Sequence, residues 1–413
     1  MSTKTTYKQT ELGLIPDDWE VKKLGEIGKI INGLTYSPEN IKENGTLVLR
    51  SSNVQNNRIV YDDNVFVEEN LIFNPTQKGD VLICVRNGSR NLIGKTAQID
   101  DQSSNVAFGA FMTIYRSNKN NFIYNYFKSD NFFREVHRNL GATINSINNN
   151  DLKKFKIPLP PLPEQKAIAD CLSTWDVAIE KQSQLIETLT QRKKALMQQL
   201  LTGKKRLPGF SEEWKEVKLG DIGKTYNGLT GKTKEDFGEG EPFITYMNIF
   251  SNSKIDISNF EYVKIGVNEN QNKTIYGDIF FTVSSETPDE VGMASVLLDR
   301  VDNLYLNSFC FGFRLNDLKS LLPEFSSYLF RNDLFRKEVY KLAQGSTRFN
   351  LSKLELMKIK IKLPPIEEQT AIAEILATAD RELQLQKEKL MQLQTQKKGL
   401  MQVLLTGKKR LIN

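Results

Sequence analysis

Apolar and polar positions alternate over short distances through the first part of the chain. Runs of apolar, β-branched or aromatic residues are bounded by Gly, Asn and Asp, a pattern that predicts short strands joined by turns. The runs lie at 47–49, 79–85 and 111–115, with counterparts at 243–246, 277–283 and 309–313. Each set is followed by a segment expected to be helical, a turn rich in small and polar residues, and a basic segment expected to be a strand. These segments are 122–140, 141–143 and 152–157, then 323–342, 345–347 and 356–361.

From Glu164 onward the apolar spacing becomes that of a long helix, and the same spacing returns near the C-terminus. In each copy eight of ten positions are apolar, and the exceptions are a Gln and then a Lys at the same two places. An unbroken apolar stripe at spacing 3.5 predicts the seam of a coiled coil. The seam positions are Ile168, Leu172, Trp175, Ile179, Gln182, Ile186, Leu189, Lys193, Leu196 and Leu200, and then Ile372, Leu376, Ala379, Leu383, Gln386, Leu390, Leu393, Lys397, Leu400 and Leu404.

The alternative is that each helix packs only on its own globular domain, as most amphipathic helices do. Length argues against this alternative, because a helix from Glu164 to Leu201 spans roughly 57 Å at 1.5 Å per residue, more than the width of a small domain. If the helices pair, connectivity makes the pair antiparallel, since the first helix delivers the chain to the second domain and the second helix starts there. The C-terminal tail then lies beside the N-terminal domain, and the polar seam positions fix the register at some cost in stability.

Two motifs frame both helices and show that the chain is an internal repeat. The sequence PPLPEQ at 160–165 returns as PPIEEQ at 364–369, and LLTGKKRL at 200–207 returns at 404–411. An opening that contains Trp and LGxIG, at 19–28, returns at the same length at 214–223. We therefore expect an α/β fold with two similar globular domains joined by a long antiparallel helix pair. The expected parts are 1–163 and 208–365 for the domains, and 164–207 and 366–413 for the helices with their tails.

Composition limits the chemistry that the chain can carry. At 413 residues the chain is too long for one ordinary core, and its net charge of +6 permits nucleic-acid binding without proving it. The three cysteines lie far apart, and His137 is the sole histidine, so neither a disulfide framework nor a zinc site is expected. No apolar run suggests a signal peptide or a membrane span, which predicts a cytoplasmic protein.

Three possible active-site patterns are weak. The GKT sequences at 94–96 and 231–233 lack the first glycine of a phosphate-binding loop. The E-x-K sequences at 20–22 and 216–218 lack an upstream acidic partner at a consistent spacing, so solvated strand edges are the better interpretation. His137 has no recognisable nucleophile beside it in the sequence. We therefore expect no catalytic, cofactor-binding or metal-binding residues in this chain.

The loops after the predicted strands are rich in side chains that read bases and phosphates. Arg can bond to guanine, Asn and Gln to adenine, and Ser or Thr to either base or phosphate. These loops differ between the halves although the strands before them match, as expected for two readers of different sequences. For any single residue, an ordinary polar loop is an equally good explanation. The candidates are Arg50, Ser51, Ser52, Asn53, Asn57, Arg58, Arg86, Asn87, Ser89, Arg90, Asn91 and Thr143, and then Tyr246, Asn248, Asn252, Ser284, Ser285, Thr347, Arg348 and Asn350.

The basic GKKR sequences at 203–206 and 407–410 have two interpretations of equal weight. A glycine just after a helix with cations beside it is an ordinary C-terminal cap. The same cations could instead contact phosphates where a helix meets a domain.

Taken together, the paired PPLPEQ and PPIEEQ helix starts, the two LLTGKKR ends, the turn before each basic segment and the repeated opening resemble the specificity subunits of type I restriction-modification systems. The resemblance extends over nearly the whole chain. It implies that each domain reads one half of a bipartite site on double-stranded DNA, and that the helices measure the spacer and dock two modification subunits. These partners would carry S-adenosylmethionine and methylate adenine, while restriction subunits would add translocation and cleavage driven by ATP and Mg²⁺.

The leading hypothesis is thus a non-enzymatic sequence reader and scaffold. Two alternatives stay open at the level of sequence. One is an autonomous DNA-modifying or DNA-cleaving enzyme with an unrecognised active site, and the other is a coiled-coil scaffold that does not bind DNA.

Overall fold

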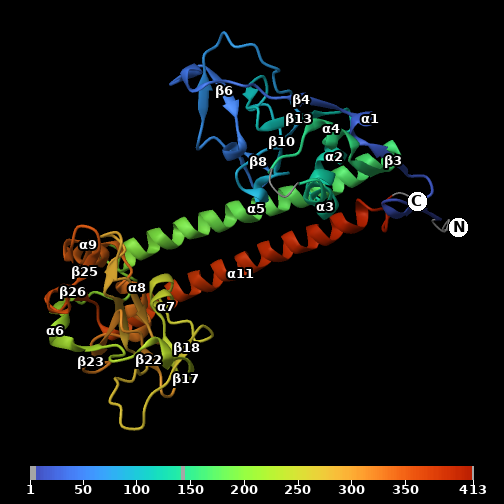
Figure 1. Ribbon diagram of the computed structural model, residues 1–413. Coiled ribbons are helices and arrows are strands. Elements are labelled where there is room, and N and C mark those ends of the chain that lie inside the picture. The colour runs from blue at the N-terminus through green and yellow to red at the C-terminus, as the bar shows by residue number, and fades with distance from the viewer. Residues whose placement is uncertain (1–5, 141–144, 412–413) are drawn as a thin grey trace. The chain divides into compact units, whose positions relative to one another are not determined.

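The computed structural model describes residues 6–140 and 145–411, and these residues form two compact units. Unit 1 comprises the first 183 residues together with residues from Glu388 onward, and unit 2 comprises Gln184–Lys387. The boundary lies within the two long helices, so each unit holds one globular domain, part of α5 (Leu162–Leu200) and part of α11 (Ile366–Leu404). Figure 1 shows the elements of each unit.

Unit 1 is built on two four-stranded sheets with the orders β11-β10-β13-β4 and β12-β6-β9-β5. The first is antiparallel, and the second includes the parallel pair β12 and β6. Three two-stranded sheets, β1-β2, β3-β14 and β7-β8, complete the set. The strands are β1 (Tyr7–Thr10), β2 (Gly13–Pro16), β3 (Glu20–Lys23), β4 (Lys29–Asn32), β5 (Ile41–Lys42), β6 (Thr46–Leu49), β7 (Val54–Gln55), β8 (Arg58–Ile59), β9 (Val65–Val67), β10 (Val81–Cys84), β11 (Thr96–Gln98), β12 (Ala107–Phe108), β13 (Met112–Arg116) and β14 (Lys156–Leu159). The helices are α1 (Leu24–Ile27), α2 (Asn120–Phe127), α3 (Asp130–Asn139) and α4 (Asn149–Lys154), with short 3-10 turns η1 (Pro38–Asn40), η2 (Ser51–Asn53) and η3 (Arg90–Leu92).

Unit 2 repeats this plan with the sheets β16-β23-β19-β21, β18-β17-β22 and β15-β26, and adds β20-β25-β24. Its parallel pair is β17 and β22, in the place of β6 and β12. The strands are β15 (Lys215–Lys218), β16 (Gly223–Asn227), β17 (Phe237–Ile244), β18 (Glu261–Val263), β19 (Ile279–Thr282), β20 (Ser284–Ser285), β21 (Ala294–Val296), β22 (Tyr305–Leu306), β23 (Cys310–Leu315), β24 (Ala343–Gln344), β25 (Phe349–Leu351) and β26 (Lys360–Leu363). The helices are α6 (Leu219–Ile222), α7 (Tyr246–Ser251), α8 (Pro323–Leu329), α9 (Asp333–Lys341) and α10 (Lys353–Leu356), with η4 (Lys234–Asp236).

A buried ion pair holds the central strands of both antiparallel sheets together. In unit 1, Arg116 Nε and Nη2 donate to the two oxygens of Asp80 at 2.8 and 2.7 Å. In unit 2, Arg314 makes the same two bonds to Asp278. Each carboxylate is about 1% exposed, so the hydrogen bonds from Arg compensate for its desolvation and raise the pKa of the guanidinium.

Several predicted boundaries differ from the structure. The segment 122–140 is two helices, α2 and α3, because Ser129 ends one and its hydroxyl caps the next by accepting from Phe132 N; Asn332 does the same before α9. The basic segments 152–157 and 356–361 begin as helical turns and become strands only at Lys156 and Lys360, so the strand prediction there was partly wrong. The predicted strand 243–246 ends early, because Thr245 caps α7.

Both long helices contact the globular core of their units at their ends. Ile168 and Leu172 of α5 pack in the core of unit 1 together with Met401 and Leu404 of α11. Leu200 of α5 packs in the core of unit 2 together with residues of the α11 start. Every predicted seam position is buried or half-buried. The alternative interpretation, packing on a globular domain, therefore describes the helix ends, where seam residues contact both the domain and the other helix.

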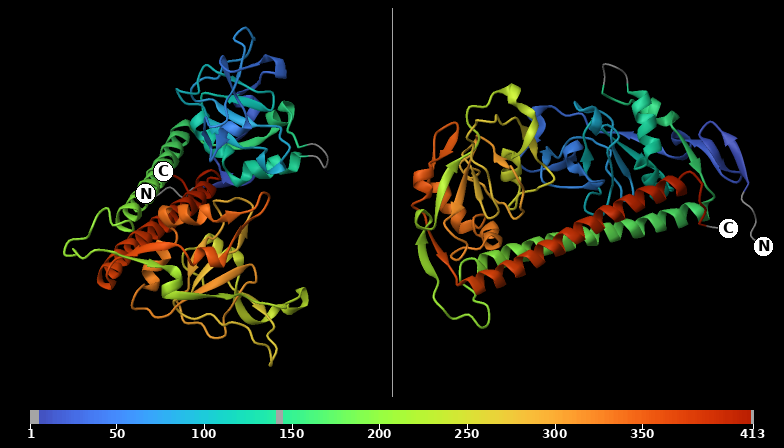
Figure 2. Two further views of the ribbon diagram at one scale, coloured as in Figure 1. Left: turned by 90° about the vertical axis from the view of Figure 1, so that its left-hand side faces the viewer. Right: turned by 90° about the horizontal axis from the view of Figure 1, so that it is seen from below.

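The lysines of the seam pair with carboxylates of the opposite helix. In unit 1, Lys397 of α11 pairs with Asp176 of α5. In unit 2, Lys193 of α5 pairs with Asp380 of α11. The members of the second pair are the repeat counterparts of the first, and in each unit the two helix segments lie side by side and run in opposite directions (Figures 1 and 2). A cation in an apolar stripe is tolerated because its charge is satisfied by the facing helix.

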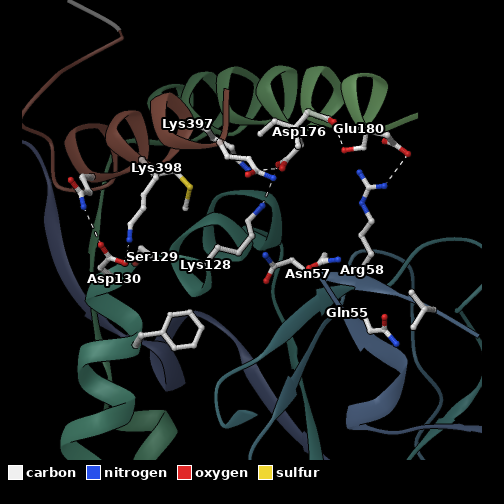
Figure 3. A pocket seen from close by; sticks show the side chains of 18 residues that line it. Gln55, Asn57, Arg58, Lys128, Ser129, Asp130, Asp176, Glu180, Lys397 and Lys398 are labelled. Carbon is white, nitrogen blue, oxygen red and sulfur yellow. Dashed lines mark hydrogen bonds and ion pairs between the residues drawn. The ribbon is translucent and has the colours of Figure 1, made fainter. Parts of the chain in front are cut away.

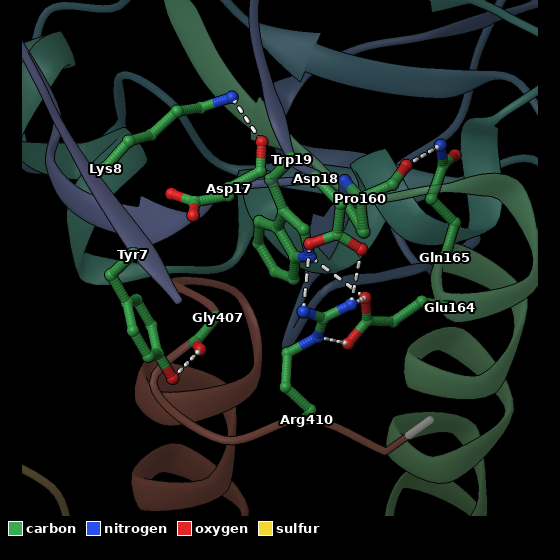
Figure 4. A network of polar contacts seen from close by, with 10 residues as sticks. All are labelled: Tyr7, Lys8, Asp17, Asp18, Trp19, Pro160, Glu164, Gln165, Gly407 and Arg410. Atoms are coloured by element: carbon green, nitrogen blue, oxygen red, sulfur yellow. Dashed lines mark hydrogen bonds and ion pairs between the residues drawn. The ribbon is translucent and has the colours of Figure 1, made fainter. Parts of the chain in front are cut away.

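Three residues that both halves of the repeat share, a Trp, a Glu and an Arg, meet in one contact in each unit. In unit 1, Arg410 donates to both oxygens of Glu164 at 2.6 and 2.7 Å, and Trp19 Nε1 donates to the same carboxylate at 2.9 Å (Figure 4). Arg410 also pairs with Asp18, which lowers the pKa of that carboxyl. In unit 2, Arg206 and Trp214 bond to Glu368 in the same way. We refer to the arrangement of Trp, Glu and Arg as the tail contact.

The structure supports the cap interpretation for the glycine of each GKKR sequence, while a contact of the exposed lysines with phosphates stays a prediction. Gly203 and Gly407 adopt φ values of +69° and +70°, the left-handed conformation of a helix C-terminal cap. The Arg of each sequence is held in the tail contact, and the lysines before it are exposed. The cap therefore accounts for the glycine, and the ion pair accounts for the arginine.

Arg410→Ala is expected to destabilise unit 1 by ~3–5 kcal/mol, because the Glu164 carboxylate, 2% exposed, would lose its cation. Thermal unfolding followed by circular dichroism measures the effect. Lys409→Ala, a change at an exposed neighbour, is the matched control and should stay within ~0.5 kcal/mol of the parent. Equal melting temperatures for the two variants would contradict this role of the tail contact.

Candidate nucleic-acid interface

Two of the predicted loops meet in unit 1. The loop after β6 contains Ser51, and the loop after β10 contains Asn87, whose Nδ2 donates to Ser51 Oγ at 3.0 Å. Ser89 N donates back to Asn87 Oδ1, which shapes the second loop into a turn that leaves Arg86, Ser89, Arg90 and Asn91 exposed. The candidates of these loops thus form one polar surface.

An exposed aromatic ring lies in the middle of this surface. Phe111 is 56% exposed, and the guanidinium of Arg86 lies 5.7 Å from its ring centroid. The backbone oxygen of Phe111 accepts hydrogen bonds from Val85 and Arg86, so the ring is fixed next to the loop. The cation is attracted to the ring, and the exposed pair presents one apolar and one charged group that base edges, sugars and phosphates can contact.

The repeated NGLT sequence explains how this aromatic loop is held. A Cβ at Gly33 would lie 2.2 Å from Gly109 O, and a Cβ at Gly228 would lie 2.1 Å from Asn307 O. Only glycine permits this approach of the backbone to the loop that carries the exposed ring. Because the approach occurs in both units, the glycines support the geometry of the surface in each.

The residues around Arg50 divide into exposed and structural ones. Asn53 is buried, and its amide bonds to the backbone of Arg50 and Val60, so it shapes the loop. Arg50 pairs with Asp63 at 2.8 Å. The Nε of Arg50 and the Oγ of Ser52 have no hydrogen-bond partner among the described residues. These two groups border a hollow of about 420 Å³ that Phe111 also lines. Thr143 lies outside the described residues.

Unit 2 assembles its candidates in a different way. Strand β20, with Ser284 and Ser285, pairs with β25, which brings Ser284 opposite Asn350. Tyr246 OH donates to Ser284 O at 2.9 Å and so joins the loop after β17 to this ladder. Asn350, Thr347 and Arg348 are exposed at the end of the ladder. The two serines are buried, and Ser285 Oγ bonds to Glu290.

Two candidates of unit 2 are structural in this conformation. Asn248 is buried, and its amide bonds to the backbone of Asp256 and Asn259, as Asn53 bonds within unit 1. Asn252 Nδ2 donates to Asn248 O, and Asn252 O accepts from Arg331. Neither amide is directed to solvent, so both shape the loop after β17.

Sequence reasoning missed the exposed aromatic residues. Phe309 is 61% exposed at the position equivalent to Phe111, since Val283 N donates to its carbonyl as Val85 N donates to that of Phe111. Met247 is also exposed beside this region. Both phenylalanines were assigned to predicted strands. One signal could have identified them. Each phenylalanine comes directly before the first residue of its strand, β13 or β23, and two residues after the position that the NGLT glycine contacts, Gly109 or Asn307.

Asn57 and Arg58 lie on a separate hairpin that faces the helices. Asn56 and Asn57 adopt φ values of +50° and +60°, which suit the turn between β7 and β8. Arg58 pairs with Glu180 of α5 at 3.0 Å, and Tyr124 OH donates to Asn57 O. The hairpin, α3 and the two helices border a groove of about 660 Å³ (Figure 3).

Lys128 lies in this groove, where it shares Asp176 with Lys397. Burial, and then repulsion by Lys397, lowers the pKa of Lys128 to about 8. The unfolded chain, with a lysine pKa of about 10.4, binds more protons between pH 8 and 10.4. The charged Lys128 therefore costs stability below pH 8, and the free energy of unfolding should rise with pH across that window.

Lys128→Met is expected to remove this rise and to stabilise unit 1 by ~1 kcal/mol at pH 7. Chemical denaturation at pH 7 and at pH 9.5 measures both effects. Lys398→Met, at an exposed lysine that borders the same groove, should leave the dependence on pH unchanged. A parent protein whose stability falls between the two pH values would contradict the assignment.

The remaining titratable groups show no arrangement for catalysis in the described part of the chain. Burial raises the pKa of Cys84 to about 11 and also raises that of Cys310, so neither thiol ionises near neutral pH. Among residues 6–140 and 145–411, no three His, Cys, Asp or Glu side chains lie close enough to hold a metal ion. No helix in those ranges is long and apolar enough to cross a membrane.

Comparison with known proteins identifies the family. A sequence profile for the type I restriction modification DNA specificity domain matches twice, at residues 16–191 and 211–395. A Methanocaldococcus jannaschii protein named "Putative type I restriction enzyme MjaX specificity subunit" is 29% identical over 98% of this chain and 96% of its own length. The type I restriction enzyme EcoKI specificity subunit of Escherichia coli K12 is 26% identical, over 87% of this chain and 82% of its own.

A solved structure shares the fold. That structure was described in work entitled "Structural basis underlying complex assembly and conformational transition of the type I R-M system". One of its chains matches with a TM-score of 0.63 and 18% identity, over 96% of the present chain and 99% of its own length. The two profile matches each cover one globular domain and most of one long helix. The chain therefore belongs to the type I restriction-modification DNA specificity family, as a non-catalytic specificity subunit.

Proposed function

We propose that each unit reads one half of a bipartite target on double-stranded DNA through the surface around its exposed phenylalanine. In unit 1 this surface consists of the two loops joined by Ser51 and Asn87, with Arg86 and Phe111 at its centre. In unit 2 it consists of Phe309, Tyr246 and the exposed residues at 347–350. The observation that carries the proposal is the repetition of one scaffold with different side chains at the same place.

We propose a smaller set of contact residues than the sequence alone suggests, chosen by side-chain exposure and hydrogen bonding. Asn53, Asn248 and Asn252 are committed to loop structure, so we assign them a supporting role. Asn57 and Arg58 are directed to the helix side, and we do not include them in the reading surface. Ser284 and Ser285 are buried, so we also assign them a supporting role. The proposed contact residues are Arg50, Ser51, Ser52, Arg86, Asn87, Ser89, Arg90, Asn91 and Phe111 in unit 1, and Tyr246, Thr347, Arg348, Asn350 and Phe309 in unit 2.

We also propose that α5 and α11 form one antiparallel coiled coil that sets the distance between the half-sites and docks two modification subunits. The ion pairs of Lys397 and Lys193 with the facing helix, and the burial of the seam, support the coiled coil. In this assignment 1–163 and 208–365 are the recognition domains, and 164–207 and 366–413 are the helices with their tails. S-adenosylmethionine, ATP and Mg²⁺ belong to the modification and restriction subunits, and the complex acts on DNA in the cytoplasm.

Arg86→Ala is expected to weaken binding to target DNA by ~1–3 kcal/mol, because Arg86 lies at the centre of the proposed surface. Fluorescence anisotropy with the assembled methyltransferase and a labelled duplex, repeated over a range of salt, measures the affinity and its slope on salt. The matched control is Arg138→Ala, at an exposed arginine on α3 that pairs with Glu135. Binding that is independent of salt, or equal losses for both variants, would contradict the proposed reading surface.

A further inference from the structure

The surface beside α9 of unit 2 differs from the equivalent surface beside α3 of unit 1, although the two units share a fold. In unit 2, a groove of about 530 Å³ lies between α9, the β15–β26 sheet and the end of α5. Its walls include Leu334 and Lys337 on α9, Lys362 on β26, and Trp214. Leu334 is 53% exposed, so the groove presents an apolar surface. Charged residues lie at its edge: Lys341 pairs with Glu338 and Lys360 with Glu216, and Lys337 and Lys362 add further positive charge.

The corresponding place in unit 1 is filled. Asn131, Arg134, Arg138, Pro158 and Thr406 border a space of about 160 Å³. These residues are the repeat counterparts of Leu334, Lys337, Lys341, Lys362 and Thr202, all of which line the groove of unit 2. Tyr126 and Glu135 also line the space in unit 1, and its other wall comes from Glu11, Leu12, Leu14 and Ile15 of the β1–β2 hairpin.

The hairpin is firmly attached to unit 1. Ile15 is 2% exposed and belongs to the core that contains Trp19, which is fully buried. Glu11 pairs with Lys156, and Tyr7 OH donates to Gly407 O at 3.1 Å (Figure 4). The hairpin thus supplies aliphatic side chains and a carboxylate to a surface with cations.

Unit 2 has no such hairpin, because residues 201–214 lead from α5 directly to β15. Trp214 therefore stays partly exposed, although its indole makes the same bond to Glu368 that Trp19 makes to Glu164. Lys360, the counterpart of Lys156, pairs with Glu216 instead. The groove of unit 2 thus has the same walls as the surface of unit 1 that the β1–β2 hairpin covers, but no described segment of unit 2 covers it.

We propose that this groove binds a β-hairpin of a partner protein that carries an aliphatic side chain and a carboxylate. The aliphatic group covers Leu334 and Trp214, as Ile15 and its neighbours cover the corresponding surface of unit 1. The carboxylate pairs with Lys337 of α9 and Lys362 of β26, since Lys341 and Lys360 already pair with Glu338 and Glu216. A second copy of this chain is disfavoured, because its hairpin would first have to leave unit 1 and expose Ile15. The proposal is independent of how the loops read DNA.

The probe is a backbone-cyclised peptide of residues 6–17, which closes where Asp17 N already donates to Thr6 O at 3.1 Å. Titration of the full-length chain with this peptide should show one saturable site. Leu334→Asp should weaken the peptide at least ten-fold. Leu354→Asp, at a leucine of α10 that is 77% exposed and outside the groove, should bind it like the parent. A peptide with Glu11→Lys should bind more weakly to the parent chain.

A chain without residues 1–15 opens the groove of unit 1 and should bind two peptides. If that variant fails to fold, the difference in peptide affinity between Leu334→Asp and Leu354→Asp still tests the proposal. Absence of saturable binding, or equal binding by those two variants, would overturn the proposal. Self-association of the parent chain in sedimentation that Leu334→Asp abolishes would also overturn it, because the occupant would then be a second copy.

Discussion

Replacing residues 208–362 with the same region of a relative is expected to change one half of the DNA target and to leave the other half unaltered. The exchanged region holds every proposed contact residue of unit 2, including Tyr246, Phe309 and Asn350. The Arg206–Glu368 and Lys193–Asp380 pairs lie outside it, so the helices keep their register. Because each mismatched base pair costs ~1–3 kcal/mol, methylation of the original target should fall more than about ten-fold.

Sequencing of methylated adenines in cells with the exchanged gene measures this outcome. The reciprocal exchange, of residues 13–158, is the matched control and should change the other half alone. A new sequence in both halves after a single exchange would show that the units do not read independently. Loss of all methylation in a chain that still binds its partners would count equally against the account.

Insertion of seven residues in each long helix, after Thr190 and after Gln394, is expected to lengthen the spacer between intact half-sites. Seven residues add about 10.5 Å to a helix, close to the length of three base pairs. A heptad keeps the apolar seam in phase, and the Lys397–Asp176 and Lys193–Asp380 pairs stay on their own sides of the insertions. Three base pairs also turn the second half-site by about 100° around B-DNA, so methylation should be slower.

The control is the same insertion in α5 alone. It lengthens one helix against the other, so the tail contact and the seam pairs cannot form together in both units. We expect that variant to unfold at lower temperature and to lose methylation. An altered half-site sequence in the double insertion, or an unaltered spacer, would contradict the proposed function of the helices as a ruler.

The architecture of the chain was predictable because it rests on periodicity and repetition. The long helices follow from the heptad spacing, and the strands at 47–49, 79–85 and 111–115 follow from short apolar runs. The break between α2 and α3 was missed because Ser129 is an N-cap within a segment that is apolar on both sides. Its hydroxyl caps the start of α3 only through a local bond, which it accepts from Phe132 N.

The candidate site was less predictable for a physical reason. Asn53 and Arg86 are both polar loop residues in the sequence, yet the amide of Asn53 satisfies backbone groups of its own loop and the guanidinium of Arg86 faces solvent. Phe111 and Phe309 belong to apolar runs in the sequence, so the pattern alone does not show that their side chains are exposed to solvent at the position before the strand. The Trp–Glu–Arg contact joins residues from distant segments, and its signal was the repetition of all three letters in both halves.

The central claim is that one non-catalytic chain specifies both halves of one bipartite target. Mapping methylated adenines across the genome, in cells with this gene and in cells without it, tests the claim most directly. The account predicts one motif with two defined half-sites and a fixed gap, present only with the gene. A single uninterrupted motif, or a bipartite motif that persists after deletion of the gene, would contradict it.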